Sequence, residues 1–326
     1  MAQPIDKKNL RIVYMGTPDF AVESLKHLVE GGYNVVGVIT MPDKPAGRGH
    51  KIQFSPVKEY ALSQGLPLLQ PEKLKDENFI TELRDWKADL QIVVAFRMLP
   101  EIVWNMPRLG TFNLHASLLP QYRGAAPINW AVINGEKETG ATTFFLTHEI
   151  DTGRIILQQR IPILDEDNAG TVHDKLMIMG AQMVTKTVDY ILSGNYDTIA
   201  QEEILPADIL KPAPKIFKET CRIDWSQPIE CIHNLVRGMS PYPAAWSELY
   251  LSEENPYLVK IYESEPIRKN HNLKMGTIVT DNRKYIDIAC SDGFLRPKVL
   301  QLAGKKKMPT EDLLRGFTLT EKSYFK

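Results

Sequence analysis

The sequence predicts an α/β protein with a Rossmann-like, doubly wound and mostly parallel sheet, followed by a small C-terminal β-barrel of the OB type. Three observations predict this fold. Apolar strand-like runs first alternate with helical patterns, a proline-rich stretch follows, and short β-like runs separated by turn residues come last. A chain of 326 residues exceeds the size of most single cores, which favours two domains. We expect a first domain over residues 1–207, a linker over 208–222 and the barrel over 223–326.

The first residues have the pattern of a βαβ unit. Residues 10–15 are mostly apolar, and the turn Gly16-Thr17-Pro18 follows them. Apolar residues then recur at helical spacing as far as Leu28, and Gly31 is typical of a helix end. A second apolar run over residues 35–40 completes the order strand, helix, strand within about 30 residues.

The same alternation continues along the chain. Ser55 before Pro56 predicts the N-cap and the first position of a helix. A long helix is expected to open at Thr171 and to close near Gly194. Further strands are predicted over residues 90–95, 110–115, 141–146 and 154–161.

The C-terminal part has a different character. Pro206, Pro212 and Pro214 interrupt regular structure between the two predicted domains. After them, turn residues such as Asp281-Asn282 separate short β-like runs, which suits a small barrel. These runs are predicted over residues 258–261, 276–280, 285–289 and 299–302.

Composition excludes several classes of protein. A hydrophobic content of 43% with 24% charged residues is typical of a globular chain, and no apolar stretch reaches the roughly 18 residues of a membrane span. No initial segment resembles a signal peptide. The three cysteines, Cys221, Cys231 and Cys290, lack metal-like spacing. We therefore expect a cytoplasmic protein whose thiols are packed inside, without a disulfide or a zinc site.

The charge is unevenly distributed along the chain. Residues 1–207 carry 20 Lys and Arg against 25 Asp and Glu, whereas residues 208–326 carry 19 against 15. The balance of −5 in the first part and +4 in the second is weak support for an anionic partner of the C-terminal part. An ordinary solvated surface explains an offset of this size as well.

The segment Phe112–Trp130 holds the residues best suited to catalysis. Asn113 and His115 are two positions apart at the end of a predicted strand, so their side chains share one face. Catalytic groups in open parallel sheets gather beyond the carboxyl ends of the strands. Asp151 follows in a turn marked by Gly153. A hydrogen-bonded structural histidine and a plain Asp-Thr-Gly turn remain the alternatives for these residues.

An asparagine, a histidine and an aspartate suit acyl transfer to an amine. The asparagine N–H can donate to a carbonyl oxygen that gains negative charge. A histidine changes charge near neutral pH, so it can handle the proton that the amine loses and the one that the leaving nitrogen gains. A carboxylate can orient the histidine, stabilise its cation or handle a proton through water.

Four stretches occur in an order that is typical of one enzyme family. They read RIVYMGTPDFA, MPDKPAGRGHKIQFSPVKEYA, FNLHASLLPQYRGAAPINWAVINGEKETGATT and DTGRI. With them the chain resembles the methionyl-tRNA formyltransferases, a family of 10-formyltetrahydrofolate-dependent transferases. The resemblance is strong over residues 10–170 and thinner through KIFKETCRIDW and RGMSPYPAAW.

The resemblance implies an activity and its residues. A formyl group would pass directly from 10-formyltetrahydrofolate to the α-amino group of methionine on initiator Met-tRNA, through a tetrahedral intermediate, on a monomer that needs no metal. Asn113, His115 and Asp151 match the family's catalytic residues. The residues implied in folate binding are Phe96, Arg97, Leu99, Ser117, Leu118, Leu119 and Pro120.

The resemblance also implies a tRNA-binding loop, here Pro42–Lys51. It contains three cations and a histidine within eight residues, together with the flexible Gly47 and Gly49, which suits contact with phosphates. The loop residues implied in tRNA contact are Lys44, Arg48, His50 and Lys51. The run Lys305, Lys306, Lys307 could follow the acceptor arm of the tRNA, and a plain surface turn explains it equally well.

Two positions depart from the family pattern. The chain reads AFRMLP where the family has Tyr-Gly ahead of Ile-Leu-Pro, so Arg97 adds a cation beside the expected pterin pocket. It either contacts the carboxylates of the folate or points outward. Ala116 stands where a glycine is common, which adds only one methyl group.

Other functions fit the sequence less well. A sugar-nucleotide N-formyltransferase is the main alternative because it shares the three catalytic residues and a second domain, but a small nucleotide sugar does not require the basic loop. Glycinamide ribonucleotide formyltransferase is normally a single domain. A nucleic-acid-binding module with an inactive transferase domain would not need the intact trio. The sequence leaves open whether His115 or Asp151 is the general base, and which tRNA elements are read.

The basic loop generates a direct test. Replacing Arg48 with alanine should weaken the use of tRNA and make it less sensitive to salt. Each phosphate contact that is lost lowers the number of counterions released from the tRNA on binding. Binding of the folate donor should be unchanged. Measuring the Kd for Met-tRNA over a range of salt concentrations gives the slope, and a slope equal to that of the native protein would argue against contact by this loop.

Overall fold

The computed structural model describes residues 6–46, 51–204, 209–252 and 256–326, and for residues 44–46 and 51–52 it describes the backbone only. The chain divides into two compact units, and each contains several stretches of the sequence. Unit 1 comprises Met1–Gly124, Thr139–Ile161 and His173–Pro212, and unit 2 comprises Ala125–Glu138, Pro162–Val172 and Ala213–Lys326. The continuous domain ranges drawn from the sequence stay predictions.

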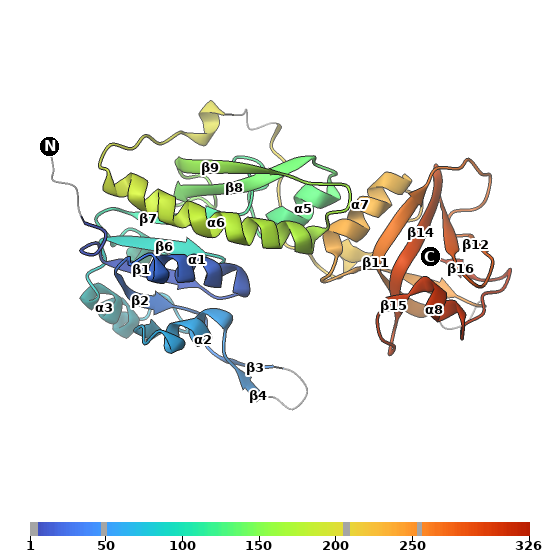
Figure 1. Cartoon of the computed structure of the whole chain (residues 1–326), viewed down its shortest axis with the longest axis horizontal. Helices are drawn as coiled ribbons and strands as arrows, with labels where there is room; N and C mark the ends of the chain where they lie inside the picture. Colours follow the sequence, from blue (N-terminus) through green and yellow to red (C-terminus); the bar gives the residue numbers. More distant parts are fainter. Residues whose placement is uncertain (1–5, 47–50, 205–208, 253–255) are drawn as a thin grey trace. The chain divides into compact units, whose positions relative to one another are not determined.

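Unit 1 is built on a seven-stranded sheet (Figure 1). Pairing is parallel from β5 through β2, β1 and β6 to β7, and β8 pairs with β7 in the antiparallel direction. The predicted α/β fold with a mostly parallel sheet is therefore confirmed. In spatial order the strands are β5 (Leu68–Leu69), β2 (Val35–Ile39), β1 (Ile12–Gly16), β6 (Leu90–Val94), β7 (Thr111–His115), β8 (Glu138–Phe145) and β9 (Ile155–Pro162).

Helices connect and cover these strands. The N-cap predicted at Ser55 is confirmed, since its Oγ accepts a hydrogen bond from the N–H of Lys58 at 3.1 Å and Pro56 opens the helix. The helices are α1 (Asp19–Glu30), α2 (Pro56–Ser63), α3 (Glu77–Asp85), α4 (Glu101–Trp104) and α6 (Ala169–Leu192), with a short 3₁₀ turn η1 (Gln201–Glu203). A separate two-stranded hairpin is formed by β3 (Lys44–Ala46) and β4 (Lys51–Gln53).

Glycines allow close approach of the covering elements to the sheet. A Cβ built on Gly180 of α6 would lie 2.7 Å from the side chain of Leu114 in β7, so this helix lies directly against the strand that carries Asn113 and His115. On β2, a Cβ on Gly37 would lie 2.4 Å from the ring of Trp86. The first contact helps to fix the position of β7, and the second that of β2.

The strand order reverses beside β1. The chain builds outward from β1 through β2 and β5, then crosses back to place β6 on the other side of β1. Ligands of open α/β sheets bind beyond the carboxyl ends of the strands at such a switch point. The segments that follow β6 and β7 are therefore where a site is expected.

Unit 2 contains a nearly closed antiparallel barrel. Its strands follow the order β12-β13-β14-β11-β10-β16, and β15 pairs with β14. The two ends of the sheet approach each other, because the N–H of Phe325 in the last strand donates at 2.9 Å to the carbonyl of Gly276, which lies just before the first strand of this order. The predicted small barrel is thus confirmed. The strands are β10 (Ala245–Tyr250), β11 (Tyr257–Ile267), β12 (Ile278–Thr280), β13 (Ile286–Cys290), β14 (Gly293–Leu302), β15 (Met308–Pro309) and β16 (Tyr324–Phe325).

A helix that the sequence analysis did not predict fills this barrel's core. Helix α7 (Ile229–Met239) contributes Ile229, Ile232 and Val236 to it. Gly238 lets α5 (Pro127–Ile133) approach, since a Cβ there would lie 2.4 Å from the side chain of Ile133. The Asn129 amide also donates to the Gly238 carbonyl at 2.7 Å. The remaining elements are α8 (Thr310–Leu314) and the 3₁₀ turn η3 (Glu219–Cys221).

The cysteines only partly follow the expectation. Cys221 and Cys290 are buried, but Cys231 is exposed, so the prediction that all three are packed inside was wrong. Cys231 lies on α7 between residues that face the core, and its helical position turns it outward. Within the described ranges, no helix has both the length and the apolar character needed to cross a bilayer.

Candidate active site

Strand β7 places two of the predicted catalytic residues. Asn113 pairs with Val93 of β6 on one side and with Phe144 of β8 on the other, while His115 pairs with Thr142 of β8. Both strand edges are thus occupied, which holds the backbone of β7 rigidly. The side chain of Asn113 is half-buried and makes no hydrogen bond within the described part of the chain.

His115 is held by the loop that follows its own strand. Its side chain is buried, and its Nε2 lies 2.9 Å from the carbonyl oxygen of Tyr122. A carbonyl can only accept a hydrogen bond, so Nε2 carries the proton and Nδ1 is the acceptor in the neutral ring. The ring of Phe144 packs edge-on against the imidazole, with 6.5 Å between centroids. The direct hydrogen bond that orients His115 is therefore the one to Tyr122.

Asp151 lies opposite the free nitrogen of this imidazole. Its Oδ2 is 3.9 Å from His115 Nδ1, which is too long for a hydrogen bond but short enough for an ion pair when the ring is protonated. The same Oδ2 accepts a hydrogen bond from the N–H of Gly124 at 2.9 Å. The structure thus brings His115 and Asp151 together from positions far apart in the sequence.

The loop Ser117–Pro120 is held inside unit 1. Ser117, Leu119 and Pro120 are buried, and only Leu118 is half-exposed. The hydroxyl of Thr142 donates to the carbonyl of Ser117 at 2.6 Å and accepts from the N–H of Leu119 at 3.1 Å. The buried side chains of this loop therefore support a site rather than line an open surface.

Arg97 does not point freely outward. Its Nη1 donates to the carbonyl of Glu72 at 2.8 Å, and its Nη2 donates to the carbonyl of Pro71. Burial lowers the pKa of this guanidinium from its ordinary value. Arg97 therefore ties the loop after β6 to the segment after β5, an arrangement that the sequence did not indicate.

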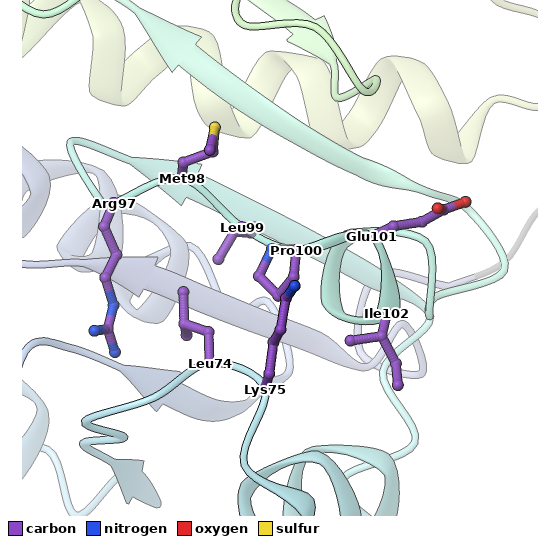
Figure 2. Close-up of a pocket in the computed structure, with 8 residues that line it drawn as sticks. All are labelled: Leu74, Lys75, Arg97, Met98, Leu99, Pro100, Glu101 and Ile102. Atoms are coloured by element: carbon purple, nitrogen blue, oxygen red, sulfur yellow. The ribbon is translucent and has the colours of Figure 1, made fainter.

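A pocket of about 590 Å³ lies beside this connection (Figure 2). It is lined by Leu74, Lys75, Arg97, Met98, Leu99, Pro100, Glu101 and Ile102. In Figure 2, Met98 and Arg97 extend to opposite sides of their loop, and Leu74 and Lys75 come from the facing segment. Two of the predicted folate residues, Arg97 and Leu99, line the pocket, whereas Phe96 and the loop 117–120 do not.

The predicted tRNA residues are only partly described. Arg48 and His50 lie outside the described residues, and Lys44 and Lys51 belong to β3 and β4, whose backbones pair. The run 305–307 is an exposed turn after β14, and the ammonium of Lys307 lies 4.5 Å from the ring centre of Tyr262. Their role in tRNA contact stays a prediction.

Sequence reasoning missed several side chains that hold the site. Thr142 and Gln158 support the loop 117–120, since the Gln158 amide donates to the carbonyl of Leu119 at 2.6 Å. Arg123 and Gln201 support the turn of Asp151. Arg123 belongs to the family-like stretch quoted above, but no pattern in the sequence distinguishes Gln201 from other glutamines.

Comparison with known proteins identifies the family. The family model "Formyl transferase" matches residues 9–188, and the model "Formyl transferase, C-terminal domain" matches residues 215–318. The methionyl-tRNA formyltransferase of Bacteroides thetaiotaomicron is 69% identical over 315 residues, which cover 97% of this chain and 98% of the relative. The chain belongs to the methionyl-tRNA formyltransferase family. Its relative in Flavobacterium johnsoniae, of the same name, is 52% identical over 97% of this chain and 99% of its own.

Solved structures of this fold include one that is described as a sugar formyl transferase. WlaRD, described as a sugar 3N-formyl transferase, superposes with a TM-score of 0.63 at 20% identity, covering 91% of this chain and 99% of its own. HypX of Aquifex aeolicus, solved in complex with tetrahydrofolic acid, gives a TM-score of 0.59 at 17% identity over 94% of this chain and 47% of its own. At this identity the likeness concerns the fold alone.

The turn of Asp151 generates a prediction for Gly153. A Cβ on Gly153 would lie 1.7 Å from the carbonyl oxygen of Phe145, so Gly153→Ala must displace the turn. We expect a loss of unfolding free energy of about 1–3 kcal/mol and a lower kcat, measured by urea unfolding and formyl transfer. Gly316→Ala is the control, because nothing lies within 4 Å of a Cβ there. Native-like stability and turnover in Gly153→Ala would mean that the turn relaxes without consequence.

Proposed function

We propose that this protein transfers the formyl group of 10-formyltetrahydrofolate to the α-amino group of methionine on initiator Met-tRNA, in the cytoplasm. The observation that carries the proposal is the 69% identity, over 97% of the chain, to a relative named methionyl-tRNA formyltransferase. An amide, a buried imidazole and a carboxylate at the end of β7 suit this chemistry. The folate-containing structures of WlaRD and HypX support a folate donor.

The proposed transfer begins with attack of the amine on the formyl carbon. The carbonyl oxygen gains negative charge as the tetrahedral intermediate forms, and the Asn113 amide donates a hydrogen bond to it. Because the attacking nitrogen is part of the acceptor itself, the formyl group passes directly between the substrates. Isolation of a formylated enzyme would contradict this step.

His115 and Asp151 divide the handling of the proton. Since Nε2 of His115 is bound to the carbonyl of Tyr122, Nδ1 is the atom that can accept the proton of the amine. The Asp151 carboxylate, 3.9 Å away, then stabilises the imidazolium. Return of this proton to the leaving nitrogen completes the cycle. We therefore propose His115 as the base and Asp151 as the residue that stabilises its charged form.

The acceptor decides between the two main functions. We would incubate the purified protein with 10-formyltetrahydrofolate and Met-charged initiator tRNA, and run a UDP-amino-sugar in parallel. Formyl-Met-tRNA alone is the expected product. Formylation of the sugar alone would preserve the role of the three catalytic residues but refute a tRNA acceptor.

Replacing His115 should lower the rate of catalysis without weakening the binding of Met-tRNA. His115→Ala is expected to bind Met-tRNA with native affinity, because the imidazole is buried, and to lower kcat by about 10²- to 10⁴-fold, as loss of a general base does. Single-turnover formylation and filter binding measure the two quantities. His27→Ala, which changes a histidine on α1, is the control. A parallel loss of binding and turnover would argue for a structural role of His115.

The pocket after β6 should serve the folate donor. Arg97→Lys keeps the charge but replaces the planar guanidinium, which donates to two carbonyls at once. The loop that lines the pocket should loosen, and we expect KM for 10-formyltetrahydrofolate to rise several-fold while KM for Met-tRNA is unchanged. Arg84→Lys, on the exposed end of α3, is the matched control. A native donor KM in Arg97→Lys would separate the pocket from donor binding.

A further inference from the structure

Gln201 is buried although glutamine is usually exposed. It begins the 3₁₀ turn η1, and only 1% of its surface is accessible. It lies between residues 188 and 215, the stretch that neither family model covers. A buried amide must have hydrogen-bond partners to offset the loss of water. Its partners therefore show what the residue does.

The Gln201 amide has four hydrogen bonds, two at each end. Its Nε2 donates to the carbonyl oxygens of Asp151 and Gly153, both at 2.8 Å. Its Oε1 accepts from Nε and Nη2 of Arg123, at 3.0 and 2.6 Å. The reverse orientation of the amide would place its NH₂ against the guanidinium and its oxygen against two carbonyls. The partners thus allow only one orientation.

The backbone that Gln201 holds is unusual. Asp151 has a φ of +55°, a left-handed conformation that is uncommon for a residue with a side chain. Such a conformation persists only where the surroundings determine it. Gln201 holds the carbonyl of Asp151, and the N–H of Gly124 holds its carboxylate. Arg123 and Gly124 are neighbours in the chain. Gly124 binds the carboxylate of Asp151 directly, and Arg123 supports its backbone carbonyl through Gln201.

We infer that Gln201 is a positioning residue for formyl transfer: it fixes the Asp151 turn so that the carboxylate faces Nδ1 of His115. The inference rests on the proposed function, since it assigns a role within the same site. Gln201 acts through Asp151, since within the described residues it makes no hydrogen bond to His115 or Asn113. A displacement of about 1 Å in a catalytic group can cost on the order of 100-fold in rate, so support of this kind affects turnover.

Two variants of Gln201 test the inference. Gln201→Glu keeps the acceptor for Arg123 but replaces the donor of two hydrogen bonds with a carboxylate oxygen facing two carbonyls. Gln201→Met has a similar volume and no hydrogen-bonding amide. We expect both to lower kcat on the order of 10- to 100-fold, while KM for the folate and for Met-tRNA stays within about twofold. Thermal unfolding of each variant shows whether the protein still folds.

A matched control separates this effect from general loosening of the segment. Arg154 donates from Nε at 2.7 Å to the hydroxyl of Thr198, three residues before Gln201, and in the part of the chain that the structure describes neither side chain forms a hydrogen bond with Asp151. Thr198→Val removes that hydrogen bond and should leave kcat native. Equal losses of kcat in Thr198→Val and Gln201→Met would overturn the inference.

A double-mutant cycle asks whether Gln201 acts through Asp151. In native background Gln201→Met should lower kcat strongly, and in an Asp151→Asn background it should lower the single-turnover rate by less than about threefold. Equal effects in both backgrounds would overturn the inference even if Gln201→Met is destabilised. If the native protein does not formylate Met-tRNA, the proposed function fails; if it does and the Gln201 variants match it, only the positioning role fails.

Discussion

The loop that follows β7 is buried although it belongs to no strand or helix, so its peptide groups need hydrogen-bond partners other than water. Side chains from β8 and β9 supply them: Thr142 pairs with Ser117 and Leu119, and Gln158 pairs with Leu119. The direction of the loop is fixed as a result. Further along the loop, the carbonyl of Tyr122 accepts a hydrogen bond from His115, so the loop also binds the strand from which it starts.

The turn before β9 obeys the same constraint. Its backbone passes close to the carbonyl of Phe145, where only a glycine fits, and its carbonyls are paired by the amide of Gln201. Burying polar groups costs little free energy when each has a hydrogen-bond partner, and much more when one partner is removed. The backbone of this turn is therefore held partly by Gln201, which lies outside the sequence motifs that contain Asn113, His115 and Asp151.

Local patterns were enough to predict much of the fold. The βαβ unit, the cap at Ser55 and the barrel of short strands follow from hydrophobic period, capping chemistry and turn residues within a few positions of one another. Helix α7 was not predicted, although Ile229, Ile232 and Val236 recur at helical spacing. The family resemblance suggested the catalytic residues, which spacing alone left open.

The supporting contacts could not be predicted, because they join distant positions. Gln201 lies 50 residues from Asp151 and 78 from Arg123, and Arg97 lies 25 residues from Glu72. Nothing in the local sequence of either residue indicates a partner at such a distance. For Arg97 the sequence offered two alternatives, contact with the folate or an outward position. The structure has a third, in which its cation is bound by backbone carbonyls.

The fold by itself does not select the acceptor. A sugar N-formyltransferase superposes on this chain over 91% of its length, so the sheet and the barrel are compatible with an amine on a small sugar as well as one on a tRNA. In the proposed mechanism, Asn113 polarises the formyl group and His115 takes a proton from an amine that reaches the end of β7. We therefore expect selection to come from elements outside the sheet, such as the predicted tRNA-binding loop 42–51, whose Lys44, Arg48 and Lys51 suit a polyanion. On the proposed function, chemistry and selection reside in different elements, so a change in one need not disturb the other.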